Sequence, residues 1–184
     1  MLTRGFTATR VDEVCAEAGL TKGSFFHYFK SKEEFAEAAL DYYWTKTQAM
    51  LRAAPSVALE DPLARVHGYL DLFVAIAADE GVEKSCLFGN LSQELAPTHP
   101  ALQAACSSGF SRWAGQIAGE LEEAKRLHPP RVDFDSASLA DHFIAVYEGS
   151  LVLAKAKGDA RVLAENVEHF RAYLDALFGR RSDE

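Results

Sequence analysis

The chain has 184 residues, of which 48% are hydrophobic and 25% charged, as in soluble proteins that fold as one domain or as a small module joined to a larger one. Its formal net charge of −8 excludes a protein that coats nucleic acid with its whole surface, and the absence of apolar runs near the roughly 18 residues of a membrane span excludes a transmembrane protein. Because there is no signal-peptide pattern and the three scattered cysteines form no CxxC pair, we expect a cytoplasmic protein without disulfides or a bound metal.

Two short helices are predicted near the N-terminus. The first has Thr9 as its candidate cap and apolar residues at the spacing of a helical turn, namely Val11, Val14, Cys15 and Ala18. Gly19 and Leu20 break this pattern, and Thr21 can cap a second helix that carries Phe25, Phe26, Tyr28 and Phe29. Two short helices joined by a tight turn with glycine are typical of a helix-turn-helix, whose second helix can enter the major groove of DNA.

A longer helix is predicted to follow. Ser31 and Glu34 have the spacing of a capping box, which predicts a helix from there to about Ala53. The segment 54–61 and the prolines around it read as a linker. We therefore expect a DNA-binding domain over residues 1–53 and a second domain over residues 62–179.

The second domain is predicted to be helical throughout. Its expected helices cover residues 62–79, 83–95, 100–128, 136–157 and 159–178. Gly158 and Gly179 are candidate C-terminal stops, because glycine readily takes the left-handed conformation that ends helices. No segment shows sustained alternation of period two, so the predicted fold class is all-α.

The window 19–32 concentrates positive charge, with three lysines, one histidine and no acidic residue. The hydroxyls of Thr21 and Ser24, with the backbone N–H groups at the start of the second helix, can bond phosphate oxygens. His27 and Tyr28 offer polar tips on flat rings, which suit phosphates or thymine methyl groups. An acidic chain with such a window would contact DNA only locally.

A buried aromatic cluster is the alternative interpretation of the same window. It suits Phe25 and Phe29, which would hold the small helices together. Phe26, His27 and Tyr28 lie on adjacent helix faces and cannot all be buried.

Several short groups of residues stand at fixed spacing along the first 33 positions: Gly5-Phe6, Ala18-Gly19, Thr21-Lys22-Gly23 with Ser24, His27-Tyr28-Phe29 and Ser31-Lys32-Glu33. This pattern resembles the DNA-binding domain of the TetR family. The resemblance implies double-stranded operator DNA as a partner, contacted by Thr21, Lys22, Gly23, Ser24, Phe26, His27, Tyr28 and Lys32. Phe26 stands where the family commonly has tyrosine, so packing without a hydroxyl-to-phosphate bond is expected there.

The start of the chain departs from this family. A longer first helix there precedes the Gly-Phe pair, whereas only residues 1–4 precede Gly5 here. We therefore expect an incomplete N-terminal domain, through truncation, a start codon placed too late or loss of the helix. Apolar surface on Val11, Val14 and Phe25 should then lie open.

Apolar residues occupy two faces of the helix predicted over 136–157. One stripe, made mainly of large residues, is called the large face and consists of Leu139, Phe143, Val146, Ser150 and Leu153. The second stripe, the small face, consists of His142, Ala145, Gly149, Val152 and Ala156. We expect the large face to line the core. The TetR resemblance implies a homodimer, in which the small face would meet a second subunit together with Phe170, Leu174 and Leu177. The alternative is that both faces are core.

The resemblance also implies a pocket for an unknown small-molecule effector that releases the repressor from DNA. Ligand pockets are mostly apolar with a few polar groups. The candidate lining residues are Tyr69, Phe73, Cys86, Phe88, Trp113, Phe143 and Tyr147. Each of them could equally be ordinary core.

The stretch 85–94, SCLFGNLSQE, resembles the Gly-Cys-Leu-x-x-x-Leu-x-x-Glu helix of a TetR subgroup, with Ser85 in place of glycine. That subgroup includes repressors that respond to electrophiles through a thiol. Cys86 matches its cysteine, and Lys155 falls where a lysine can approach it. A nearby ammonium group would favour the reactive thiolate. The alternative is a small buried cysteine that fills a gap.

Neither an enzyme nor a cofactor is expected. The histidines show no metal-ligand spacing, and the chain has no nucleophile motif or phosphate loop. The rival to a DNA-binding regulator is a helical adaptor whose helix-turn-helix contacts protein or has lost DNA binding. Salt separates the two, because a DNA reader loses affinity steeply as salt rises.

Overall fold

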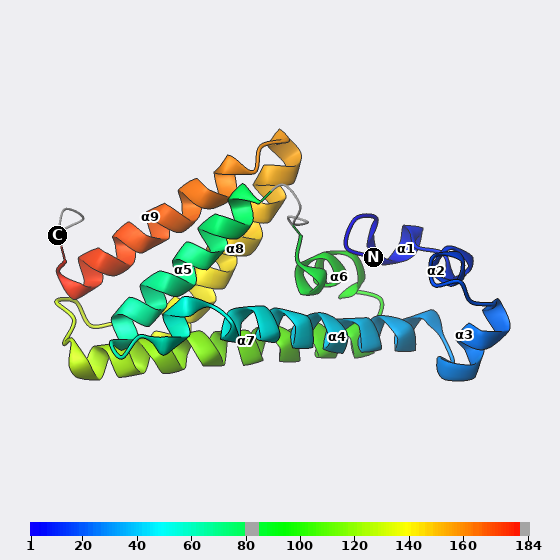
Figure 1. Ribbon diagram of the computed structural model, residues 1–184, viewed down its shortest axis with the longest axis horizontal. Coiled ribbons are helices and arrows are strands. Elements are labelled where there is room, and N and C mark those ends of the chain that lie inside the picture. The colour runs from blue at the N-terminus through cyan, green and yellow to red at the C-terminus, as the bar shows by residue number, and fades with distance from the viewer. Residues whose placement is uncertain (80–84, 181–184) are drawn as a thin grey trace. The chain divides into compact units, whose positions relative to one another are not determined.

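Every regular element in the described residues, 1–79 and 85–180, is helical in the computed structural model (Figure 1). The predicted all-α class is confirmed. The elements are α1 Gly5–Ala8, α2 Val11–Glu17, α3 Lys22–Tyr28, α4 Lys32–Arg52, the 3₁₀ turn η1 Pro55–Ala58, α5 Pro62–Ala78, α6 Leu87–Leu95, α7 Pro100–Leu127, α8 Ser136–Lys157 and α9 Arg161–Phe178. None of the helices in this described part is long and apolar enough to cross a membrane.

The chain packs as two units. Unit 1 comprises residues 1–48 and 85–110, and so contains α1, α2, α3, α6 and the first parts of α4 and α7. Unit 2 comprises the described residues of 49–79 and 111–180, with η1, α5, α8, α9 and the remainders of α4 and α7. Because α4 and α7 contribute to both units, the domain boundaries 1–53 and 62–179 stay predictions.

The break between α2 and α3 is formed by backbone geometry at Gly19. Its φ is +66°, in the left-handed region, and the N–H of Leu20 donates to the carbonyl of Cys15 at 2.8 Å. This bond back across the last turn closes α2. Thr21 then caps α3, since its hydroxyl oxygen accepts the N–H of Ser24 at 3.1 Å. The predicted break and cap are confirmed.

The predicted cap of α2 is wrong by one residue. Arg10 is the N-cap, and its N–H donates to the carboxylate of Glu13 at 3.0 Å. Thr9 is instead the residue that ends α1, where its hydroxyl donates to the carbonyl of Gly5 at 2.7 Å. Thr9 thus serves the preceding turn.

Helix α4 begins as predicted, with the Ser31 hydroxyl accepting the N–H of Glu34 at 3.2 Å. The return bond differs from a standard capping box, because the carboxylate of Glu34 accepts the N–H of Lys30 at 2.6 Å. The helix ends at Arg52, and the predicted linker contains η1.

Helix α6 begins later than predicted. Its first residue is Leu87, with an extended Cys86 as the N-cap, whereas positions 83 and 84 of the expected helix lie outside the described residues. Ser85, the residue before this N-cap, is held by hydrogen bonds to residues that are distant in the sequence. The Ser85 hydroxyl donates to the carbonyl of Leu2 at 3.1 Å, and the Ser85 carbonyl accepts from the Tyr43 hydroxyl at 3.3 Å.

The boundaries of α8 match the prediction, and α9 starts at Arg161, two residues later than expected. Asp159 remains outside the helix because its carboxylate accepts the N–H of Arg161 at 3.0 Å. Gly158 and Gly179 end α8 and α9 with φ of +64° and +73°, which confirms both as stops.

Helix α9 packs against both α5 and α8 to form the core of unit 2 (Figure 1). Leu70, Leu163 and Leu174 from these helices are each at most 1% exposed. At the edge of this packing, Arg171 of α9 donates to Asp71 of α5 at 2.5 Å and to Glu168 at 3.0 Å. The helices of unit 2 are thus joined by an apolar core with ion pairs at its margin.

Candidate nucleic-acid interface

The inner face of α3 is fastened by one buried aromatic residue. Phe25 is 5% exposed, and its ring centroid lies 5.3 Å from that of Phe29 and 5.4 Å from that of Phe35. The expectation that Phe25 would lie open is therefore wrong, because aromatic rings from α4 and the preceding turn cover it. Val11 and Val14 are half-buried.

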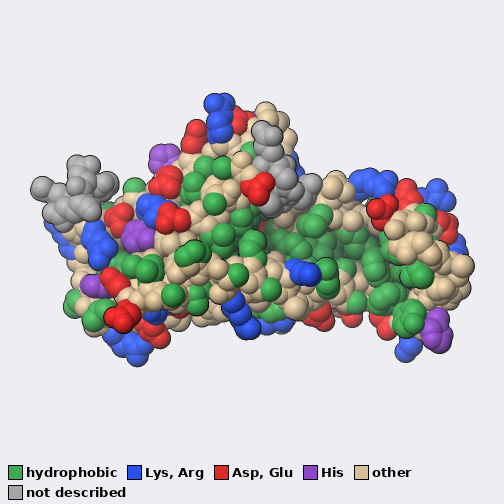
Figure 2. Space-filling model, viewed as in Figure 1, with side chains coloured by type: hydrophobic (Ala, Val, Ile, Leu, Met, Phe, Trp, Pro, Cys, Tyr) green, Lys and Arg blue, Asp and Glu red, His purple; other side chains and the backbone are tan. Residues whose placement is uncertain are grey.

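The outer face of α3 is aromatic and exposed. Phe26 is 49% exposed and Tyr28 is 71% exposed, and His27 is exposed between them, with its ring centroid 5.0 Å from that of Tyr28. None of the three is core, which agrees with the prediction that they could not all be buried. Basic, histidine and hydrophobic side chains adjoin at the α3 end of the surface in Figure 2.

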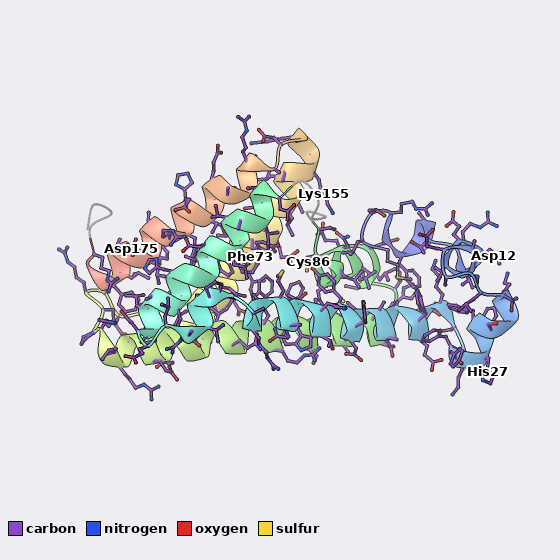
Figure 3. All side chains as sticks on the ribbon, in the orientation of Figure 1. Asp12, His27, Phe73, Cys86, Lys155 and Asp175 are labelled. Atoms are coloured by element: carbon purple, nitrogen blue, oxygen red, sulfur yellow. The ribbon has the colours of Figure 1, made fainter. Side chains whose placement is uncertain are left out.

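The two lysines that are predicted to contact DNA are the first residues of α3 and of α4. Lys22 opens α3 and forms an exposed ion pair with Asp12 of α2 at 3.1 Å, and Figure 3 labels Asp12 and His27 on their helices. Lys32 opens α4, with its Nζ 3.4 Å from the carbonyl oxygen of Thr7 and 4.2 Å from the ring centroid of Phe6.

The cap of α3 brings the remaining predicted contacts together. The hydroxyls of Thr21 and Ser24 lie 2.9 Å apart, and both residues are on the surface of the module. A Cβ on Gly23 would meet only the Thr21 hydroxyl, at 3.7 Å, so this position leaves the backbone open to an approaching molecule. We call the residues predicted to contact DNA the α3 surface, which is polar and aromatic: Thr21, Lys22, Gly23, Ser24, Phe26, His27, Tyr28 and Lys32.

The predicted dimer residues fall into two groups. The small face of α8 is exposed at His142, Ala145, Gly149, Val152 and Ala156, whereas most of its large face is buried. Within one chain the small face is therefore not core. Phe170, Leu174 and Leu177 of α9 are at most 7% exposed and pack inside their own unit.

Five of the predicted pocket residues form one aromatic cluster in unit 2: Tyr69, Phe73, Trp113, Phe143 and Tyr147. Figure 3 labels Phe73 on α5. The indole N–H of Trp113 donates to the hydroxyl of Tyr69. Burial raises the pKa of Tyr69 far above its ordinary value, so that this hydroxyl stays protonated. We call these five residues the aromatic cluster. Cys86 and Phe88 belong to unit 1.

Cys86 is the N-cap of α6 and is 5% exposed. Lys155 is an exposed residue of α8 in unit 2, so its approach to Cys86 stays a prediction. Phe88, two residues beyond the cysteine, is buried against Gly109 of α7 and against the ring of Tyr43, whose centroid is 5.8 Å away.

Sequence reasoning gave no role to Glu94, although it is the last residue of the 85–94 motif. Its carboxylate accepts the N–H of Phe6 at 2.6 Å and that of Thr7 at 2.7 Å. The motif could have marked Glu94 as functional, but nothing local indicates a partner 88 residues away.

Two family models together match most of the chain. Residues 1–39 match the model described as bacterial regulatory proteins of the tetR family, and residues 62–170 match the tetracyclin repressor-like C-terminal domain. The first match covers the α3 surface. The second covers the helices that hold the aromatic cluster.

Whole-chain comparisons agree with these matches. The transcriptional regulator AcuR of Cereibacter sphaeroides is 31% identical over 152 residues, which are 83% of this chain and 69% of AcuR. The HTH-type transcriptional repressor DhaR of a Mycobacterium species is 27% identical over 96% of this chain and 84% of its own length. The crystal structure of the regulatory protein TetR from Rhodobacter sphaeroides has a TM-score of 0.79 and 29% identity, over 90% of this chain and 87% of that one. These relatives are regulators and not enzymes, and the chain belongs to the TetR family of transcriptional regulators.

Proposed function

We propose that the chain is a homodimeric repressor that binds a palindromic operator through the α3 surface and is released by a small-molecule effector. The observation that carries the proposal is the exposure of Phe26, His27 and Tyr28 on a helix whose inner face is anchored by Phe25. Adjacent exposed apolar groups on one surface mark a site that binds a partner. The related DhaR is a repressor. Such a regulator acts on DNA in the cytoplasm.

The small face of α8 supports the homodimer. Its exposed alanine and glycine residues allow a second backbone to approach closely, and Tyr173 of α9, 48% exposed, stands beside His142 with ring centroids 5.7 Å apart. A two-fold axis at this face would pair identical surfaces. Phe170, Leu174 and Leu177 would then support the interface from within one subunit.

The aromatic cluster supports the effector site. It combines apolar rings with the hydroxyl of Tyr69 and the indole N–H of Trp113, the mixture that is typical of sites for small organic molecules. An effector that separates these groups would be expected to be flat and uncharged. It would change the packing of α5 against α8, which both carry members of the cluster.

Replacing Lys22 by alanine tests the DNA contact. We expect weaker binding to every duplex sequence and a decrease of about 1 in the slope of log affinity against log salt, because one phosphate contact is lost. The probe is a fluorescent duplex with the sequence that the wild-type chain enriches from a randomised pool, titrated at several salt concentrations. Lys157→Ala removes the same charge outside the α3 surface and should leave the slope unchanged.

The adaptor hypothesis makes the opposite prediction for the same titration. A wild-type chain that enriches no sequence and shows no salt-dependent binding would contradict the repressor. Equal salt slopes for the Lys22 and Lys157 variants would show that Lys22 does not contact a phosphate.

Cys86 supports a second candidate function, a sensor of electrophiles. The thiol is buried at the start of α6, so an alkyl adduct has no room there and would displace the beginning of that helix. Burial raises the pKa of the Cys106 thiol, which leaves that cysteine in the unreactive form.

The sensor hypothesis predicts that N-ethylmaleimide modifies Cys86 before the other two buried cysteines and weakens operator binding. Mass spectrometry of peptides locates the adduct, and the duplex titration measures the loss. Cys86→Ser should keep its affinity during the treatment. Unchanged affinity in fully alkylated wild-type protein would refute the sensor.

A further inference from the structure

Helix α1 is held by a side chain of α6. It is a single turn, and its N-cap Arg4 offers no side-chain hydrogen bond to the N–H groups at its start. The Glu94 carboxylate provides the acceptors instead. One of its oxygens accepts the N–H of Phe6 at 2.6 Å, and the other accepts the N–H of Thr7 at 2.7 Å. Unpaired N–H groups at a helix start need an acceptor, and an ionised one makes the stronger bond.

The chain is built to admit this carboxylate. Gly5 has a φ of +77°, and a Cβ at this position would lie 2.5 Å from the Glu94 Oε2. Burial raises the pKa of Glu94, but hydrogen bonds from Thr7 and Phe6 and the charge of Lys32 lower it more, so that it lies below its ordinary value. Glu94 is therefore ionised at neutral pH.

The single turn of α1, which Glu94 holds, also contacts Lys32. The carbonyl oxygen of Thr7 accepts from the Lys32 Nζ at 3.4 Å, and the same Nζ lies 4.2 Å from the centroid of the Phe6 ring. Phe6 is 6% exposed, so its ring is fixed. Thr7 and Phe6 thus connect the anion on α6 with the cation that opens α4.

A second bond strengthens the attachment. The side-chain N–H of Asn90, one turn before Glu94 on α6, donates to the carbonyl of Leu2 at 2.8 Å. Residues on both sides of Gly5 are therefore bound to α6.

We propose that Glu94 is a positioning residue for DNA binding, which acts through α1 on the orientation of Lys32. The proposal rests on the function proposed above, and it takes Lys32, a DNA contact that the TetR resemblance implies, to bind a phosphate. It predicts a change in DNA affinity opposite in sign to the one that electrostatic repulsion alone predicts. A carboxylate near a DNA-binding surface repels phosphates, so its removal should raise affinity. A positioning role requires that removal lowers affinity.

The test compares Glu94→Gln, which keeps one acceptor oxygen, and Glu94→Ala, which keeps none, with Glu17→Gln. Glu17 is exposed on α2, and its change removes the same charge from the same module. Amide hydrogen exchange at Phe6 and Thr7 reports the attachment without DNA, and it should become faster in the order Gln then Ala. Operator affinity should fall about tenfold in Glu94→Ala and less in Glu94→Gln, whereas Glu17→Gln should bind as tightly as wild type or more tightly.

Two further readouts separate positioning from general loss of stability. Glu94 cannot itself contact a phosphate, yet the salt slope of Glu94→Ala should fall by about 1, as it would for Lys32→Ala. The two changes combined should cost little more than Lys32→Ala alone, because they act on one contact. A lost affinity with an unchanged slope and additive effects would overturn the proposal.

The remaining outcomes are equally decisive. Glu94 variants that bind as tightly as Glu17→Gln would overturn the positioning role, and so would unchanged exchange at Phe6 and Thr7. If wild type enriches no duplex, the repressor function fails and the positioning role fails with it. If wild type binds with a steep salt slope but the Glu94 variants match it, only the positioning role fails.

Discussion

Replacing Phe143 by alanine is expected to lower the free energy of unfolding by about 3–5 kcal/mol, because the change opens a large cavity in a filled core. Phe143 is 1% exposed. Its ring centroid lies 5.5 Å from that of Phe73 on α5 and 5.1 Å from that of Phe170 on α9, so it joins three helices. Urea unfolding followed by circular dichroism measures the loss, at one fixed protein concentration so that subunit dissociation contributes equally.

Leu153→Ala is the control for this experiment. Leu153 lies on the same helix but is 46% exposed, so its truncation should change the unfolding free energy by no more than about 0.5 kcal/mol. A Phe143 variant that unfolds at the same urea concentration as the Leu153 variant would show that the aromatic cluster is loosely filled. The cluster would then have room for an effector without rearrangement.

Features that depend on neighbouring residues were predictable from the sequence. Thr21 caps α3 through the N–H of Ser24, a bond that spans only three positions. Gly158 and Gly179 end their helices because the backbone at each of them must be left-handed. Local chemistry decides such features, so composition and spacing suffice.

Features that depend on distant residues were not predictable in the same way. Helix α6 begins only at Leu87, after an extended Cys86, and the neighbouring Ser85 hydroxyl donates to the carbonyl of Leu2. Phe25 is buried because Phe35 from the next helix covers it. The role of Glu94 was missed for the same reason. Periodicity identifies the face of a helix, but it does not identify the element that covers that face.

The α3 surface could be predicted only in part from the sequence. Adjacent positions alone showed that Phe26, His27 and Tyr28 could not all be buried. The pairing of Lys22 with Asp12 and the contact of Lys32 with Phe6 required the structure, because each joins different helices. The residues predicted to contact DNA thus came from the sequence alone, whereas the groups that contact Lys22 and Lys32 were found only in the structure.

Replacing Gly109 by alanine is expected to lower the free energy of unfolding by about 1–3 kcal/mol, although alanine is the better helix former. A Cβ at this position of α7 would lie 2.2 Å from the Cε1 of Phe88 on α6. Phe88 is 4% exposed, and the ring of Phe110 has its centroid 6.0 Å away, so the Phe88 ring has no space to turn into. Helix α6 must then move away from α7.

Gly119→Ala provides the matched control, because it makes the same chemical change on the same helix where nothing lies within 4 Å of the new Cβ. It should raise the unfolding free energy by about 0.5–1 kcal/mol through helix propensity alone. The two alanine variants are therefore expected to shift the urea midpoint in opposite directions. A stabilising Gly109→Ala would mean that α6 yields easily to a single methyl group. Since α6 also carries Glu94, faster amide exchange at Phe6 and Thr7 in the Gly109 variant would show that this movement reaches α1.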